Sequence, residues 1–346
     1  MKKILFFIIT LAVSMLFIAG CSMYESNDTE GNNRQVITGE KIQKTLTSRI
    51  IKSEVDGSGQ VMLVYHYEMS NAGQANTVTA YVAPDEVLVG GGGGVVNIST
   101  SAGAYLTGSF PLRTDTGNGW CVQTKDHITP CSHSAFAYAV GMKLINNYGQ
   151  VIDKRVVADY VIYMSNTSAI AQHPSETVYI PSNYQLIGGG ARVDFPFGFF
   201  GINPYGNLLT ESMPVANVNG WRVSSKDHGY PSPTSITAFA IGIRSDIPIP
   251  DFGYLRIFID CSPITNSTAN TEAELISQDL TGMYNGWCIV GVGGYTHYES
   301  YGRLLRSLFP YPNGAYSKGI IIDKDCCYPD TGFLDIRKIW VQKQMY

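Results

Sequence analysis

The sequence has few charged residues and no long block of one charge. Asp, Glu, Lys and Arg make up 15% of its 346 residues, and the formal net charge is −4. Without residues 1–20, which we expect to be removed, the chain loses Lys2 and Lys3 and no acid, so its charge becomes −6. Nucleic-acid partners require a basic footprint, so we expect none.

Beyond its first twenty residues the sequence also lacks a long hydrophobic run. A membrane-spanning helix needs about 20 apolar residues, so we expect none in the rest of the chain. The start differs, because Lys2 and Lys3 precede an apolar run over residues 4–18. A basic start, a short apolar run and small residues before a cut are the signature of a secretory signal. Residues 1–20 are therefore predicted to be a signal peptide.

The end of this signal resembles the bacterial lipoprotein box. The residues are FIAGC, Phe17 to Cys21. The resemblance implies that Cys21 becomes the lipidated first residue of a mature protein held outside the cytoplasm on a bacterial membrane, with the cell surface as one destination. The alternative is an ordinary signal peptide with a cysteine at this place by chance. Residues 21–56 would form the tether, since residues 22–34 are polar, as flexible segments are.

Four sequence blocks recur three times in the same order, which is the signature of a repeat architecture. One phrase, GWCVQTKDH from Gly119, returns as GWRVSSKDH 101 positions later, from Gly220. The sequence therefore predicts repeats at 57–152, 153–253 and 254–346, the last degenerate and cysteine-rich. The blocks lie at residues 87–96, 185–194 and 289–298; 105–111, 208–214 and 304–310; 119–127, 220–228 and 319–326; and 136–144, 238–245 and 335–342.

The repeats read as β-strands. Trp221, Val223 and Ser225 alternate with polar residues, which is typical of a half-buried strand, and no segment shows sustained helical periodicity. The glycine-rich blocks suit a bulge or a close backbone approach. We predict an all-β protein of three tandem antiparallel repeats, built as β-prism-like or β-sandwich-like modules.

The string from Gly188 to Ile243, with GGGA, LLTESMP and GWRVSSKDH, is similar to β-prism-like modules of secreted and perforin-like bacterial proteins. The similarity covers the first two repeats well and the third poorly. It implies target recognition at membranes or glycans. No pore-forming domain accompanies these repeats, so that activity is not implied.

Six cysteines remain besides Cys21, an even number, in a compartment where disulfides persist. Cys121 and Cys131 occur together in the first repeat, and both are replaced in the other two. We therefore predict a disulfide between Cys121 and Cys131. The other four lie in the third repeat with their pairing open: Cys261, Cys288, Cys326 and Cys327. A zinc site is a weaker alternative, because paired C-x-x-C knuckles are absent.

The repeated phrase supplies the candidate binding residues. An indole face can stack on a sugar ring, and Asp and His can hydrogen-bond its hydroxyls, so we list Trp120, Asp126, His127, Trp221, Asp227 and His228. The structural alternative places the Trp in the core and lets Asp close a turn through its side chain. The third repeat keeps Lys324 and Asp325 but has Gly319 and Cys326 for Trp and His, which favours the turn role for Asp.

We predict a binding protein without cofactor, metal or catalytic residues. The glycine runs lack the Lys-Ser/Thr of a phosphate-binding loop, and no G-x-S-x-G elbow is present. The first hypothesis is recognition of glycans or the cell surface through weak sites joined in one chain, where avidity adds strength. The second is a structural or protein-partner-binding surface lipoprotein, and the third is an extracytoplasmic hydrolase.

Overall fold

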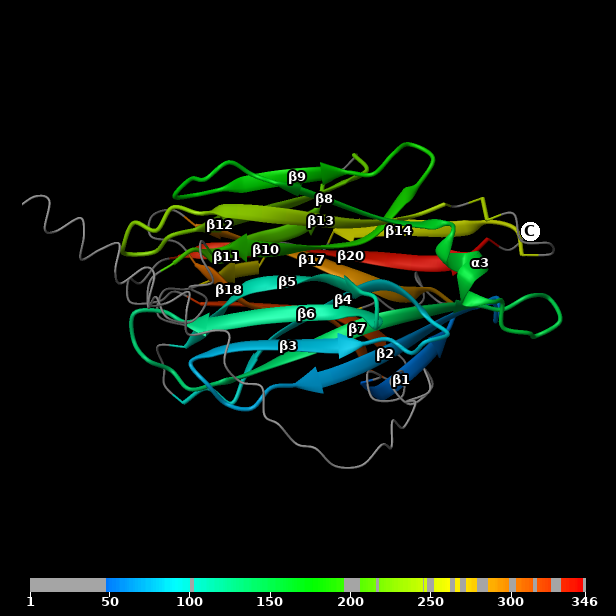
Figure 1. The fold of residues 1–346 in the computed structure, drawn as a ribbon, viewed down its shortest axis with the longest axis horizontal. Coiled ribbons are helices and arrows are strands. Elements are labelled where there is room, and N and C mark those ends of the chain that lie inside the picture. The colour runs from blue at the N-terminus through cyan, green and yellow to red at the C-terminus, as the bar shows by residue number, and fades with distance from the viewer. Residues whose placement is uncertain are drawn as a thin grey trace, which may run out of the picture. The chain divides into compact units, whose positions relative to one another are not determined.

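The computed structural model confirms the all-β class. Apart from the five-residue helix α3 (Lys154–Ala158), the elements of the described residues are strands (Figure 1). Gly39–Tyr346 group into one compact unit. The predicted signal peptide and Cys21 lie outside the described residues, as does most of the tether. The structure describes residues 48–99, 103–195, 206–215, 218–244, 246–247, 252–261, 265–267, 272–278, 286–298, 303–313, 316–324 and 331–344.

The strands form three antiparallel sheets, which we call sheets I, II and III. Sheet I has the order β1 (Arg49–Val55), β2 (Val61–Met69), β7 (Ser134–Leu144), β4 (Val87–Val96), β18 (Leu304–Asn313), β19 (Tyr316–Lys324) and β16 (Glu272–Gln278). Sheet II has the order β3 (Ala75–Tyr81), β6 (Gly117–Asp126), β5 (Ala104–Thr114), β10 (Gln185–Asp194), β13 (Ser235–Ile243) and β8 (Val161–Thr167). Sheet III has the order β14 (Leu255–Cys261), β20 (Gly332–Lys343), β17 (Cys288–Tyr298), β11 (Leu208–Pro214), β12 (Gly220–Lys226) and β9 (Ser175–Tyr179), with β15 (Thr265–Ser267) beside β20.

Each sheet is assembled from two repeats. Sheet II joins β3, β6 and β5 of the first repeat to β10, β13 and β8 of the second. Sheet III joins the second repeat to the third in the same way, and sheet I joins the third back to the first. The pairing is cyclic, so no repeat forms a sandwich of its own. One hydrophobic cluster contains residues of all three repeats, and the repeats therefore share one core.

A β-bulge recurs at the same point of each glycine-rich strand. It shifts the register between Leu88 and Gly90, between Leu186 and Gly188, and between Ile289 and Gly291. A bulge bends a strand and increases its local twist. Its threefold recurrence shows that the three repeats share one backbone plan.

The glycine runs lie where β4, β10 and β17 meet. A Cβ added at Gly90 would lie 2.1 Å from the Val290 carbonyl oxygen, and one at Gly188 would lie 2.6 Å from the Val89 carbonyl oxygen. These distances are too short for any side chain, so only glycine lets the backbones of neighbouring repeats approach this closely. The predicted close backbone approach is confirmed, and it occurs between repeats.

Candidate functional site

The tryptophans of the repeated phrase are core residues. Trp120 and Trp221 are 1% and 0% exposed. Each ring covers a glycine of a facing strand, since a Cβ at Gly91 or Gly189 would lie 2.3 or 2.2 Å from the indole Cδ2. The two indole N–H groups donate to Ser hydroxyls, at 2.9 Å in the first repeat and 3.0 Å in the second. The predicted stacking of these rings on a ligand is therefore wrong for this structure, because neither ring reaches the surface.

The aspartates of the phrase close turns. Asp126 Oδ2 accepts a hydrogen bond from the backbone N–H of Cys131 at 3.1 Å, and Asp227 Oδ2 accepts the equivalent bond from Ser232 at 3.0 Å. Asp commonly fixes a turn in this manner. The turn role is confirmed in the first two repeats, while Asp325 of the third lies outside the described residues.

The histidines of the two phrases meet inside the molecule. Both are buried, and the rings of His127 and His228 pack edge to face with centroids 5.5 Å apart. His127 Nε2–H donates to the His228 carbonyl oxygen at 2.6 Å. Burial lowers the pKa of His127 to about 4, and burial also lowers the pKa of the nearby Lys125 to about 8. The phrase thus joins the first repeat to the second instead of facing a ligand.

The predicted disulfide is not formed. Cys121 and Cys131 are buried thiols without a bond between them. The backbone N–H of Cys131 donates to the Asp126 side chain. Asp126 lies five residues along β6 from Cys121, and at about 3.3 Å per residue this separation is about 16 Å. A disulfide needs Cα atoms within about 7 Å. Cys288 is also a buried thiol, and the side chains of Cys261, Cys326 and Cys327 lie outside the described part of the chain.

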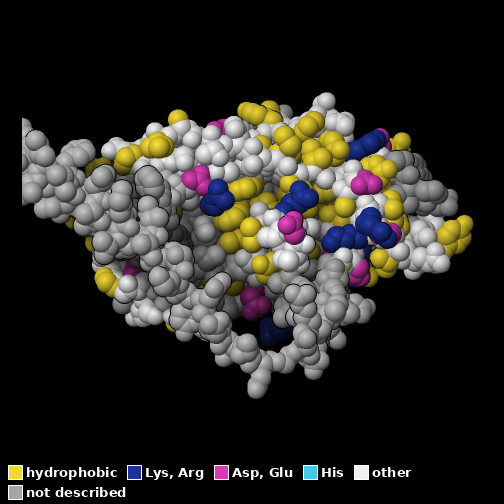
Figure 2. All heavy atoms as spheres, viewed as in Figure 1, with side chains coloured by type: hydrophobic (Ala, Val, Ile, Leu, Met, Phe, Trp, Pro, Cys, Tyr) yellow, Lys and Arg dark blue, Asp and Glu magenta, His cyan; other side chains and the backbone are white. Residues whose placement is uncertain are grey.

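An apolar groove of about 270 Å³ lies on sheet II, over β5, β8, β10 and β13. We call it the aromatic–arginine groove. The rings of Phe110 and Phe239 stack with centroids 5.3 Å apart. Figure 2 shows hydrophobic side chains gathered on this face, with basic and acidic side chains beside them. Its lining residues are Phe110, Pro111, Leu112, Arg113, Tyr163, Met164, Ser165, Arg192 and Phe239.

The two arginines of this groove differ in their partners. Arg192 lies over the stacked phenylalanines and forms an ion pair with Asp194 at 2.7 Å. Arg113 has its guanidinium carbon 4.4 Å from the centroid of the Tyr163 ring. No hydrogen bond or ion pair joins the Arg113 guanidinium to another residue that the structure describes. The N–H donors of this guanidinium are therefore not used by the described part of the chain.

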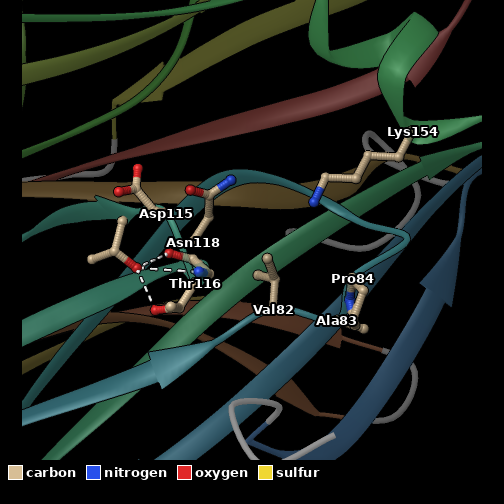
Figure 3. Close-up of a pocket in the computed structure, with 9 residues that line it drawn as sticks. Val82, Ala83, Pro84, Asp115, Thr116, Asn118 and Lys154 are labelled. Atoms are coloured by element: carbon tan, nitrogen blue, oxygen red, sulfur yellow. Dashed lines mark hydrogen bonds between the residues drawn. The ribbon is translucent and has the colours of Figure 1, made fainter. Parts of the chain in front are cut away.

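A second hollow, of about 180 Å³, adjoins the groove at the tip of the β5–β6 hairpin. We call it the hairpin pocket. It is enclosed by the β3–β4 connection at Val82–Pro84, the hairpin tip at Thr114–Asn118, and Lys154 of α3 (Figure 3). Its volume equals about six waters at ~30 Å³ each, which is of the order of one sugar ring. Arg113, which lines the groove, lies directly opposite Asn118, which lines the pocket, on the paired strands β5 and β6. Directly opposed residues share one face of a sheet, so the groove and the pocket are neighbours.

Three polar side chains of the pocket make no hydrogen bond or ion pair with the described residues. They are the Asp115 carboxylate, the Asn118 amide and the Lys154 ammonium. Figure 3 shows Lys154 extending from α3 toward the side where Asn118 lies. Burial lowers the pKa of Lys154, while the charges of Asp85 and Glu86 act in the opposite direction. A cation, an anion and an amide therefore face one small cavity.

The second repeat shows what Asn118 would do as a structural residue. Its equivalent, Asn219, accepts from Leu186 N–H at 2.8 Å and donates to the Tyr184 carbonyl at 2.6 Å. Asn219 thus fastens the β9–β10 connection. In the first repeat Glu86 fastens the corresponding connection, accepting from Ala83 N–H at 3.0 Å. The Asn118 amide is released from this task and lines the pocket.

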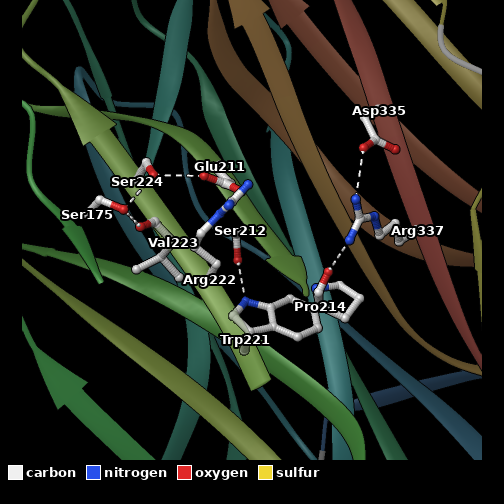
Figure 4. Close-up of polar contacts among 10 residues, drawn as sticks. All are labelled: Ser175, Glu211, Ser212, Pro214, Trp221, Arg222, Val223, Ser224, Asp335 and Arg337. Atoms are coloured by element: carbon white, nitrogen blue, oxygen red, sulfur yellow. Dashed lines mark hydrogen bonds and ion pairs between the residues drawn. The ribbon is translucent and has the colours of Figure 1, made fainter. Parts of the chain in front are cut away.

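The face of sheet III is polar and internally paired (Figure 4). Glu211 accepts from Arg222 Nε at 2.6 Å and from Ser224 Oγ at 2.8 Å. Arg337 donates to the Pro214 carbonyl and lies 3.4 Å from Asp335. The carboxylates of Glu211 and Asp335 are thus both paired with arginines.

No group of three or more His, Cys, Asp or Glu in the described ranges is placed to hold a metal ion. No helix in the same ranges is long and apolar enough to cross a membrane. One feature of the sequence marks the pocket. Pro111 and Trp120 are separated by two more residues than Pro214 and Trp221, and insertions into one repeat often map to its binding face.

No family model matches the chain, and no curated protein matches it either.

Proposed function

We propose that this chain is a lipid-anchored, extracytoplasmic binding protein that recognises glycans. The observation that carries the proposal is the hairpin pocket, where Asp115, Asn118 and Lys154 line one cavity and make no hydrogen bond or ion pair with the residues that the structure describes. A carboxylate and an amide together accept from and donate to adjacent hydroxyls, which is the hydrogen-bonding pattern of a sugar ring. The groove beside the pocket adds aromatic surface for a second sugar unit.

The proposal places the glycan site in the first repeat; it does not give every repeat a site. In the second repeat the longer tip is absent and Asn219 is engaged by the backbone of its own loop. The described residues thus provide this pocket in the first repeat. Many lipid-anchored copies on one membrane would supply the avidity that weak single sites need.

The test is a glycan array on residues 22–346, followed by calorimetric titration of the glycans that bind. Asn118→Ala removes hydrogen bonds worth about 1 kcal/mol each and should weaken binding about tenfold with unchanged stability. Asn219→Ala is the matched control, which should lower stability without changing affinity. Binding of no glycan, or equal affinities for wild type and Asn118→Ala, would contradict the proposal.

A protein partner is the second candidate, favoured by the aromatic face of sheet I. Tyr67, Phe136, Tyr138 and Phe309 pack against one another there, and Tyr311 at its border is 37% exposed. Phe136, Tyr138 and Phe309 are buried, so Tyr311 and the partly buried Tyr67 are the aromatic side chains that this face presents; aromatic residues are enriched at interfaces. Stoichiometric co-purification of one membrane protein, lost in Tyr311→Ser and retained in Asn118→Ala, would favour this function over glycan recognition.

A further inference from the structure

We infer that the glycan is acidic, with the carboxylate of one sugar unit bound by Arg113 in the aromatic–arginine groove while a neighbouring unit occupies the hairpin pocket. This inference rests on the proposed function and names the substrate class of the same site.

The contact that positions the Arg113 guanidinium uses none of its N–H donors. Its guanidinium stacks on Tyr163 at 4.4 Å, and the Tyr163 hydroxyl donates to the Leu88 carbonyl at 2.6 Å, which fixes the ring. A cation over an aromatic ring uses none of its N–H donors, so the guanidinium edge stays available. That edge matches a carboxylate, which it can bind through two parallel hydrogen bonds.

The neighbouring arginines show that an unpaired guanidinium is unusual on this part of the surface. Arg155 pairs with Asp153 at 2.9 Å, Arg192 with Asp194 at 2.7 Å, and Arg244 with Asp246 at 2.8 Å. In each case the acid follows or precedes the arginine by two positions on the chain. The acid two positions after Arg113 is Asp115, yet it lines the hairpin pocket and makes no ion pair with Arg113.

The charge balance of the combined site is positive. Among the residues that line the groove and the pocket, Arg113, Lys154 and Asp115 are charged and make no ion pair, and of the two cations Lys154 has the charges of Asp85 and Glu86 near it. Arg192 is neutralised by Asp194. One negative charge on the ligand would balance the site, and the position of Arg113 places that charge in the groove.

The floor of the groove suits a sugar ring that carries this carboxylate. The stacked rings of Phe110 and Phe239 and the half-exposed Met164 form an apolar surface beside Arg113. The C–H face of a pyranose can lie on such a surface while its carboxylate points to the guanidinium.

The test compares acidic oligosaccharides with matched neutral ones by calorimetric titration of residues 22–346. The probes are trigalacturonate against its methyl ester, and sialyllactose against lactose. At least one acidic probe should bind about tenfold to hundredfold more tightly than its neutral partner, as charged hydrogen bonds contribute about 1.5–3 kcal/mol. Arg113→Ala should abolish that preference, and Arg113→Lys should restore it in part, since lysine keeps the charge without the fork.

Arg155→Ala is the matched control, because it removes an equal charge from a nearby arginine that is already paired with Asp153. It should leave the preference unchanged. If neutral glycans bind as tightly as acidic ones and Asn118→Ala weakens them, the inference is wrong and glycan recognition stands. If sulfated lactose binds more tightly than both acidic probes, the carboxylate assignment is wrong. If no glycan binds, the proposed function and the inference fall together.

Discussion

One of the buried histidines of the first repeat, His127, predicts an acid-sensitive fold. His127 is fully buried, and it joins the repeats through its bond to the His228 carbonyl. Burial lowers its pKa from 6.5 to about 4, against the opposing effect of that carbonyl and with a further lowering by Lys125. In the unfolded chain the same imidazole takes up its proton near pH 6.5.

The difference between these two pKa values makes the folded protein less stable in acid. Between pH 6.5 and about 4 the unfolded state binds the proton and the folded state does not, so stability falls as the pH falls through this window. Above pH 6.5 the contribution is fully present. A pKa lowered by about 2.5 units at 1.36 kcal/mol per unit corresponds to a loss of about 3 kcal/mol in the free energy of unfolding.

The assay is urea unfolding of wild type and His127→Gln at pH 7 and pH 4. Glutamine retains a donor for the His228 carbonyl but cannot be protonated. Carboxylates titrate in both proteins, so the difference between the two pH profiles isolates the histidine. Wild type should lose about 3 kcal/mol more than the variant between these pH values. Equal losses would refute the assignment of a buried neutral imidazole to His127.

Two further predictions concern the core. Gly189→Ala places a Cβ 2.2 Å from Trp221 Cδ2 and 2.6 Å from the Phe239 carbonyl oxygen; overpacking of this kind costs about 1–3 kcal/mol, which urea unfolding would show, and unchanged stability would contradict the packing of Trp221 on this strand. Alkylation of the denatured, unreduced protein followed by mass spectrometry should label Cys121, Cys131 and Cys288 as thiols, whereas a recovered peptide pair linked through Cys121 and Cys131 would restore the disulfide that the sequence suggested.

Local patterns in the sequence predicted local structure well. The alternation in GWRVSSKDH identified a strand, and Asp227 closes the turn that its type and position indicated. The glycine blocks indicated a close backbone approach, which occurs at Gly90 and Gly188. These features depend on residues close together in the chain, and local chemistry is enough to predict them.

The interlocking of the repeats was not predictable in this way. A period-two strand exposes one face, but alternation does not say which neighbour covers it. The sequence pattern around Trp221 suits a core residue and a ligand-stacking residue equally well. The structure decides for the core, because Gly189, on a strand of another sheet, lies against the Trp221 ring. The paired cysteines misled for a similar reason, because Cys121 and Cys131 are close in sequence yet are separated by five residues of extended strand.

The recurring motifs of the sequence did not indicate the residues of the candidate site. A repeated phrase indicates what all repeats need, which here is core and turn structure. The polar groups without partners, Asp115 and Asn118, lie on the one hairpin that is longer than its counterpart in the second repeat. Comparing the repeats for differences would have located the pocket from the sequence.

The most direct test of the central claim is to give the first repeat the hairpin of the second. The chimera replaces residues 112–119, LRTDTGNG, by VANVNG from residues 215–220, which removes Arg113 and Asp115 and two residues of length. Calorimetric titration with the glycans that bind wild type should show no binding, while circular dichroism and thermal unfolding remain close to wild type. A folded chimera that binds these glycans with wild-type affinity would contradict the claim that this hairpin carries the function.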